Sequence, residues 1–174
     1  MAPRREDLGS WLEGTPGDPA ARAGLGLAAA GPGSPARPGR RLVGLVVDWL
    51  LSLAVGGLLF PAAGAERGLF AAAPLTTVAV FGVSSAVLVG LLGHTVGHRL
   101  AGLRVVRVRD VARPGTEAAD DAAAAARVAS APAPGILAGL VRSVLLCLAI
   151  PAVVWDADGR GLHDVAAGTV IVRR

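Results

Sequence analysis

Long runs of apolar residues dominate this chain, and the polar residues are concentrated between them. Three runs of 19 residues each lie at 42–60, 74–92 and 136–154. At about 1.5 Å of rise per residue, a 19-residue helix spans about 28 Å, close to the ~30 Å hydrocarbon core of a bilayer. A helix also satisfies its own backbone hydrogen bonds in lipid. The pattern therefore predicts three transmembrane helices in a membrane domain that covers residues 39–174.

The polar segments differ in character. Residues 1–38 are rich in Gly, Pro, Ala and Arg and lack a periodic apolar face, which predicts a disordered tail. In the connector between the second and third runs, GLRVVRVR at 102–109 partly alternates and indicates a short strand. The alanine-rich stretch at 116–130 indicates a solvent-exposed helix or a flexible insert. We therefore expect an all-α membrane protein with three transmembrane helices, a disordered N-terminal tail and a cytoplasmic connector with short strands.

The basic residues orient this domain. All 17 are arginines, and the absence of Lys, Asn, Gln and Tyr is typical of a GC-rich bacterial genome. Six arginines precede the first apolar run and six lie between the second and third, whereas one lies between the first two. The positive-inside rule then places the N-terminus and residues 93–135 in the cytoplasm, at a bacterial inner membrane. With three full crossings, the C-terminal tail would face outward.

Two charged residues interrupt the apolar runs at the same depth. Asp48 lies six residues into the first run and Arg142 six residues into the third, each about 9 Å from the start of its helix. A lone charge at a helix centre costs about 2.5–3.5 kcal/mol on insertion scales, so we expect an ion pair between them. Gly135 and Gly139 share a helix face with Arg142, and these small residues would let the third helix approach the first helix closely. Asp48 is then either part of a static packing pair or a proton or cation site.

Four blocks of this sequence resemble the RDD family of small bacterial membrane proteins, named for one arginine and two aspartates. The blocks are RRLVGLVVDWLL at 40–51, GHTVGHRLAGLRVVR at 93–107, GLVRSVLL at 139–146 and DGRGLHDVAAGTVIVRR at 158–174. The resemblance implies that Arg41, Asp48 and Asp164 are the motif residues. His98 stands where the family has a lysine, and a neutral histidine would weaken any anionic contact of that lysine. The resemblance implies no firm activity, although cation or proton exchange has been suggested for the family.

The segments 98–107 and 163–173 are similar to each other. Each has a histidine, a turn of small residues and a β-prone ending with arginine. If the two endings pair as strands, they must lie on one side of the membrane, and the third apolar run must bend back, for example at Pro151. Three full crossings are the preferred interpretation, because the matched depths of Asp48 and Arg142 need no re-entrant element.

Other candidate chemistry is weak. His94 and His98 are four residues apart, but a metal site needs a third ligand and none is near in the sequence. We expect both to be interfacial residues near lipid headgroups, and we expect no metal and no other cofactor. The chain lacks the Ser-His-Asp or Cys-His spacing of nucleophilic enzymes and a glycine-rich phosphate loop, so we do not expect an enzyme.

The sequence favours a multi-pass membrane protein of RDD type that serves as a structural or partner-binding component. The alternative is a cation/proton transporter that uses Asp48. Three spans leave little room for a pathway within one chain, so that alternative requires an oligomer. The expected partners are the lipid bilayer and either a second copy or another membrane protein. Nucleic acid is not expected, because aromatic residues that accompany arginine-rich nucleic-acid surfaces make up only 3% of the chain.

Overall fold

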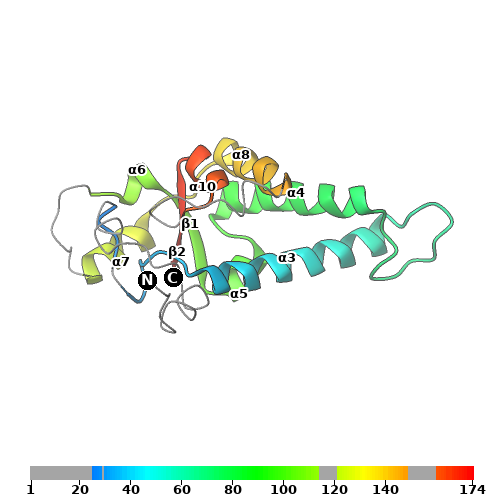
Figure 1. Ribbon diagram of the computed structural model, residues 1–174, viewed down its shortest axis with the longest axis horizontal. Helices are drawn as coiled ribbons and strands as arrows, with labels where there is room; N and C mark the ends of the chain where they lie inside the picture. Colours follow the sequence, from blue (N-terminus) through cyan, green and yellow to red (C-terminus); the bar gives the residue numbers. More distant parts are fainter. Residues whose placement is uncertain (1–24, 29, 114–120, 149–159) are drawn as a thin grey trace, which may run out of the picture.

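The computed structural model combines a long helical hairpin with a smaller cap at one end (Figure 1). It describes residues 25–28, 30–113, 121–148 and 160–174. The hairpin consists of α3 (Pro38–Leu59) and α4 (Pro74–Leu92). The other elements are α5 (Val96–Leu100), β1 (Leu103–Arg107), α6 (Val108–Val111), α7 (Asp121–Ser130), α8 (Ile136–Cys147), α10 (Leu162–Ala166) and β2 (Thr169–Arg173).

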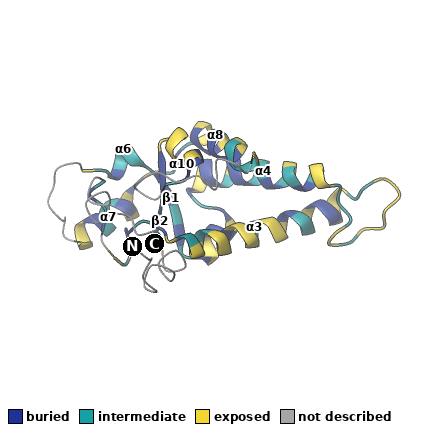
Figure 2. Cartoon of the chain, in the orientation of Figure 1, coloured by how far each residue is buried: buried dark blue, intermediate teal, exposed yellow. Residues whose placement is uncertain are grey.

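The two helices of the hairpin confirm the first two predicted apolar helices. Each begins with a proline in its first turn, where the missing N–H has no intrahelical acceptor to lose. Both are long and apolar enough to cross a membrane. The buried positions of α3 are all small, namely Gly44, Ser52, Gly56 and Gly57, and its large apolar side chains face outward (Figure 2). Outward apolar faces of this kind suit lipid better than water.

A third membrane crossing is not confirmed. The third apolar run forms α8, which has 12 residues and spans about 18 Å, too short for a full crossing. Residues 149–154 of the predicted span lie outside the described part of the chain. The helix runs antiparallel to the second half of α4: a Cβ at Gly90 would lie 2.8 Å from Ile136 Cα, and one at Gly82 would lie 3.2 Å from Cys147 Sγ. Glycines on α4 therefore let α8 pack closely against it.

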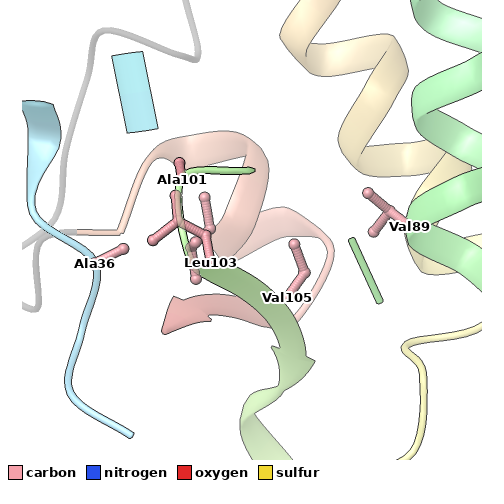
Figure 3. Close-up of a cluster of buried hydrophobic side chains, with 6 residues drawn as sticks. Ala36, Val89, Ala101, Leu103 and Val105 are labelled. Carbon is pink, nitrogen blue, oxygen red and sulfur yellow. The ribbon is translucent and has the colours of Figure 1, made fainter. Parts of the chain in front are cut away.

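The cap is built on two antiparallel strands. β1 pairs with β2 in the register Leu103↔Arg173 through Arg107↔Thr169; β2 is buried except for Arg173, whereas Arg104 and Arg107 of β1 are partly exposed. Leu103, Val105 and Ile171 form one hydrophobic cluster with Ala36 and with Val89 of α4, which joins the cap to the hairpin (Figure 3). The pairing places β2, near the C-terminal end, directly beside the connector that contains β1, which does not support the expected outward position of the C-terminal tail.

The predicted disordered tail ends earlier than residue 38. Gly33 N–H donates to Arg173 O at 2.9 Å and Ala36 N–H donates to Ile171 O at 2.8 Å, so this segment lines the second edge of β2. Backbone groups of β2 thereby find partners on both sides. Residues 1–24 and 29 lie outside the described part, and the prediction of disorder stays untested there. In the connector, the strand prediction is confirmed by β1, and the alanine-rich stretch contains α7.

Candidate functional site

The carboxylate of Asp48 is held by the start of α5. Thr95 Oγ1 donates to Asp48 Oδ2 at 2.5 Å, and Gly97 N–H donates to Asp48 Oδ1 at 2.7 Å. Thr95 is the N-cap of α5, and Gly97 is its second residue. The first N–H groups of a helix have no intrahelical acceptor and carry a partial positive charge, so a carboxylate from α3 is a suitable partner for them.

Close approach of α5 to α3 depends on glycine. A Cβ at Gly97 would lie 2.8 Å from the Asp48 carboxylate and would also overlap the carbonyl oxygen of Gly44. Cβ atoms are not found at such distances, so a larger residue would push α5 away from α3. The spacing T-x-G in the block at 93–107 thus supplies a hydroxyl, a backbone N–H and the space for a carboxylate.

His98 completes this contact from the interior of the cap. Thr95 Oγ1 accepts from His98 N–H at 3.1 Å, and Thr95 N–H donates to His98 Nδ1 at 3.3 Å, which forms a capping box. The same Thr95 hydroxyl lies 2.7 Å from His98 Nδ1. Burial, aided by the positive charges of Arg142 and Arg41, lowers the pKa of His98 to about 3, so the ring is neutral at pH 7.

This position of His98 corrects the expectation that it faces the lipid headgroups. Only 8% of the residue is exposed, whereas His94 is half-buried. The two side chains do not form a metal site with a third ligand: within the described residues, no group of three His, Cys, Asp or Glu side chains could hold a metal ion. The capping signal Thr95-x-x-His98 is visible in the sequence, but histidine is an unusual residue at its fourth position.

The second carboxylate, Asp164, lies in a buried group of opposite charges. Arg142 Nη1 donates to Asp164 Oδ1, and Arg41 Nη1 lies 3.6 Å from Asp164 Oδ2. Asp164 is fully buried, and Arg142 is 3% exposed. Thr169 Oγ1, at the start of β2, lies 3.3 Å from Asp164 Oδ1 and from the Asp164 carbonyl oxygen. The group therefore ties α3, α8, α10 and β2 together.

The expected ion pair between Asp48 and Arg142 is wrong. Among the described residues, Arg142 contacts Asp164, and it acts on Asp48 only through its charge without direct contact. The reason is the packing of α8. Its small-residue face contacts α4 and not α3, since a Cβ at Gly139 would lie 2.9 Å from Gly90 N. This contact leaves the Arg142 side chain facing α10, where Asp164 is.

The motif residues thus divide into two sites. Arg41 and Asp164 come together with Arg142, whereas Asp48 joins Thr95 and Gly97 nearby. Sequence reasoning found the four charged residues and missed the neutral donors. Thr95 and Thr169 stand in the quoted family blocks, and their positions at a helix start and a strand start are the signal that could have identified them.

A model described as the RDD family matches residues 35–168 of the chain. The matched range contains both helices of the hairpin, α8, and all the charged residues of the two sites. No curated protein and no solved structure matches the chain.

Proposed function

This chain belongs to the RDD family, and we propose that it is a multi-pass component of the bacterial inner membrane that binds a second copy of itself through its membrane helices. The observation that carries this proposal is that most residues of the two long helices are not buried against the rest of the chain. In their most apolar windows, 22% of α3 and 33% of α4 are buried within the chain. The remaining apolar surface is available to lipid and to another helix.

The ionic residues support a structural role within this proposal. Asp164 binds Arg142 and lies beside Arg41, and Asp48 binds the start of α5. Both contacts join the cap to the membrane helices. Buried groups of opposite charge that pair with each other favour one packing of a fold, because any other packing leaves a charge buried alone. The charged motif therefore serves to hold the cap against the membrane helices. Association of two copies relies on the apolar surface of those helices.

An open apolar groove of about 610 Å³ marks the surface where we place the second copy. Val55 of α3 and Phe60, the C-cap of α3, line one side, and the other lining residues come from α4. Thr76, Ala79 and Ser84 are small, and small residues in a membrane let a neighbouring helix approach closely. The occupant we propose is the hairpin of a second copy, in a symmetric dimer.

Dilution in lipid tests this association. Two differently labelled preparations of the full chain are mixed in vesicles, and energy transfer is followed as the lipid-to-protein ratio rises. Ala79→Trp should fill the groove and reduce the transfer at least severalfold. Leu91→Trp, at an exposed α4 position outside the groove, is the matched control and should behave like the parent. Transfer by the parent no greater than that expected from random proximity would reject self-association.

In this proposal the N-terminus and the cap lie in the cytoplasm, in agreement with the arginine distribution. The 12 residues of α8 then enter the bilayer from the cytoplasmic side, and the chain is on that side again at α10. The pairing of β1 with β2 supports this re-entrant arrangement. A cytoplasm-active reporter fused after Arg174 should be active, and a periplasm-active reporter at the same place should be silent. The opposite result would favour three full crossings.

A second candidate function is cation or proton transport at Asp48. The described hydrogen bonds to this carboxylate come from neutral donors, Thr95 and Gly97. A carboxylate with neutral partners can take up a proton or a cation without first losing an ion pair, unlike Asp164 with Arg142. Proteoliposomes with a pH gradient test this candidate: the parent and Asp110→Asn, a control in the cap, should move protons, and Asp48→Asn should not. Flux by the parent no greater than that of empty vesicles would exclude transport of protons.

A further inference from the structure

Three exposed arginines lie at the start of α3 and near the end of α5, outside both carboxylate sites. Arg99 belongs to α5, Arg37 is the N-cap of α3, and Arg40 lies one turn further along α3. Arg40 Nη1 donates to the carbonyl oxygen of Ala101 at 3.0 Å, so its side chain connects the start of α3 to the end of α5. We call Arg37, Arg40 and Arg99 the arginine group.

The positive charge of the arginine group is not balanced within the described residues. The ion pairs described there involve other arginines, and the two nearest motif carboxylates are engaged in their own sites. An arginine side chain has five N–H donors, and the bond to Ala101 uses one donor of Arg40 while it fixes the guanidinium in place. Exposed guanidinium ions that take part in no described ion pair, one of them held in place by a hydrogen bond, are well suited to bind a phosphate.

Exposed apolar side chains lie directly beside the arginine group. Leu100, next to Arg99, is 71% exposed, and Leu42 and Val43, next in the chain after Arg40 and Arg41, are 60% and 55% exposed. Val96, on the first turn of α5, is exposed as well. Exposed apolar surface that is rimmed by polar groups typically marks a site of contact with a partner or a membrane. At a bilayer surface the same arrangement matches acyl chains next to phosphates.

We infer that the arginine group binds the headgroup of an anionic phospholipid of the cytoplasmic leaflet, with Leu42, Val43, Val96 and Leu100 against its acyl chains. The inference rests on the membrane insertion contained in the proposed function. The occupant is a phospholipid and not free phosphate, because the apolar side chains beside the guanidinium groups would contact the lipid and would gain nothing from an inorganic ion. The binding also holds α5 at the membrane surface, next to the site of Asp48.

Lipid titration of the purified full chain in neutral detergent tests the inference. Phosphatidylglycerol, phosphatidylcholine and inorganic phosphate are added separately, and the shift of the thermal unfolding temperature gives an apparent affinity for each. Phosphatidylglycerol should bind more tightly than phosphatidylcholine, and inorganic phosphate should not protect. Arg40→Gln and Arg99→Gln should each weaken the phosphatidylglycerol response roughly fivefold. Arg109→Gln, at an exposed arginine that already pairs with Asp110, is the matched control and should change nothing.

Three results would overturn the inference: equal responses to the two lipids, equal protection by inorganic phosphate, or an unchanged lipid preference in Arg99→Gln. The Arg99 side chain has no described hydrogen bond, whereas the Arg40 side chain donates to the carbonyl oxygen of Ala101, so the Arg99 variant is the less prone of the two to disturb folding. Alkaline carbonate extraction of membranes distinguishes failure of the lipid-binding inference from failure of the proposed function. Release of the chain by carbonate would refute membrane insertion, whereas a retained chain without lipid preference would refute the arginine group alone.

Discussion

The units α5–β1 and α10–β2 each consist of a five-residue helix, a glycine in the left-handed region and a five-residue strand. Gly102 has φ 69° and Gly168 has φ 63°, a conformation that other residues rarely adopt. The two strands pair with each other in antiparallel orientation, so the two units lie side by side in the cap. Their similarity in the sequence therefore corresponds to similarity in structure.

The two units differ in how they are bound to the membrane helices. α5 receives the carboxylate of Asp48 through a hydroxyl and a backbone N–H, which are neutral donors. α10 contributes its own carboxylate, Asp164, to arginines on α8 and α3. Loss of one partner costs little in the first case and much in the second, because an ion left alone in a buried site keeps its full desolvation penalty. The following substitutions test this difference, beginning with the largest expected effect.

Asp164→Asn should be the most damaging change. It leaves Arg142, which is 3% exposed, without a negative partner, and breaking a buried ion pair in this way costs about 3–5 kcal/mol. Denaturant titration in detergent micelles, followed by circular dichroism, measures the loss. The double variant Arg142→Met, Asp164→Leu removes the closest pair and should recover part of the loss, because Arg41 still loses its contact with Asp164. A single variant as stable as the parent would show that the Asp164 site contributes little to folding.

Gly97→Ala should be the most damaging neutral change at the Asp48 site. The added methyl group would lie 2.8 Å from the Asp48 carboxylate, and overpacking of this kind costs about 1–3 kcal/mol. Gly39→Ala, on α3 with no atom within 4 Å of the new Cβ, is the matched control and should be neutral or slightly stabilising. Equal unfolding free energies of the two variants would mean that α5 does not rely on this close approach.

His98 should make stability depend on pH. Its pKa is about 3 in the folded chain and 6.5 ordinarily, because the site is buried and Arg142, Arg41, His94 and His163 lie around it. The unfolded chain therefore binds a proton that the folded chain does not, and stability falls as the pH drops from about 6.5 toward 3. The slope is about 1.4 kcal/mol per pH unit, or about 2 kcal/mol lost by pH 5.

The variant His98→Gln isolates this contribution. Glutamine at the fourth position of a capping box can still accept from the N-cap N–H, but it does not titrate. The unfolding free energy of the variant, measured between pH 5 and pH 8, should fall less steeply toward low pH than that of the parent. Parallel curves for parent and variant would indicate that His98 is protonated as readily in the folded chain as in the unfolded one.

Thr95→Val should have the smallest effect of the series. It removes the hydroxyl that caps α5 and donates to Asp48, and loss of an N-cap typically costs about 1 kcal/mol. Thr95→Ser keeps the hydroxyl and should retain most of the stability in the same denaturant titration. A cost as large as that of Asp164→Asn would contradict the distinction between neutral and ionic attachment.

Local patterns predicted much of the fold and only part of the sites. The apolar runs at 42–60 and 74–92 gave the two long helices, and alternation gave β1. The charged residues were also found, because a charge in an apolar run is expensive wherever the run folds. The pairing of those charges was predicted wrongly. Equal depth along two helices does not decide which helices touch, and Gly139 faces α4.

The sequence by itself determined the helices of the hairpin, the strand-forming segments and the identity of the charged residues, because each follows from periodicity or from the cost of burying a charge. Only the tertiary structure decided that Asp48 binds the start of α5, that Arg142 binds Asp164, and that β2 returns to the side of β1. The physical reason is that a buried charge must be matched but any opposite charge or suitable donor can match it. The choice among them is made by close packing at glycines far apart in the chain, such as Gly97 and Gly139.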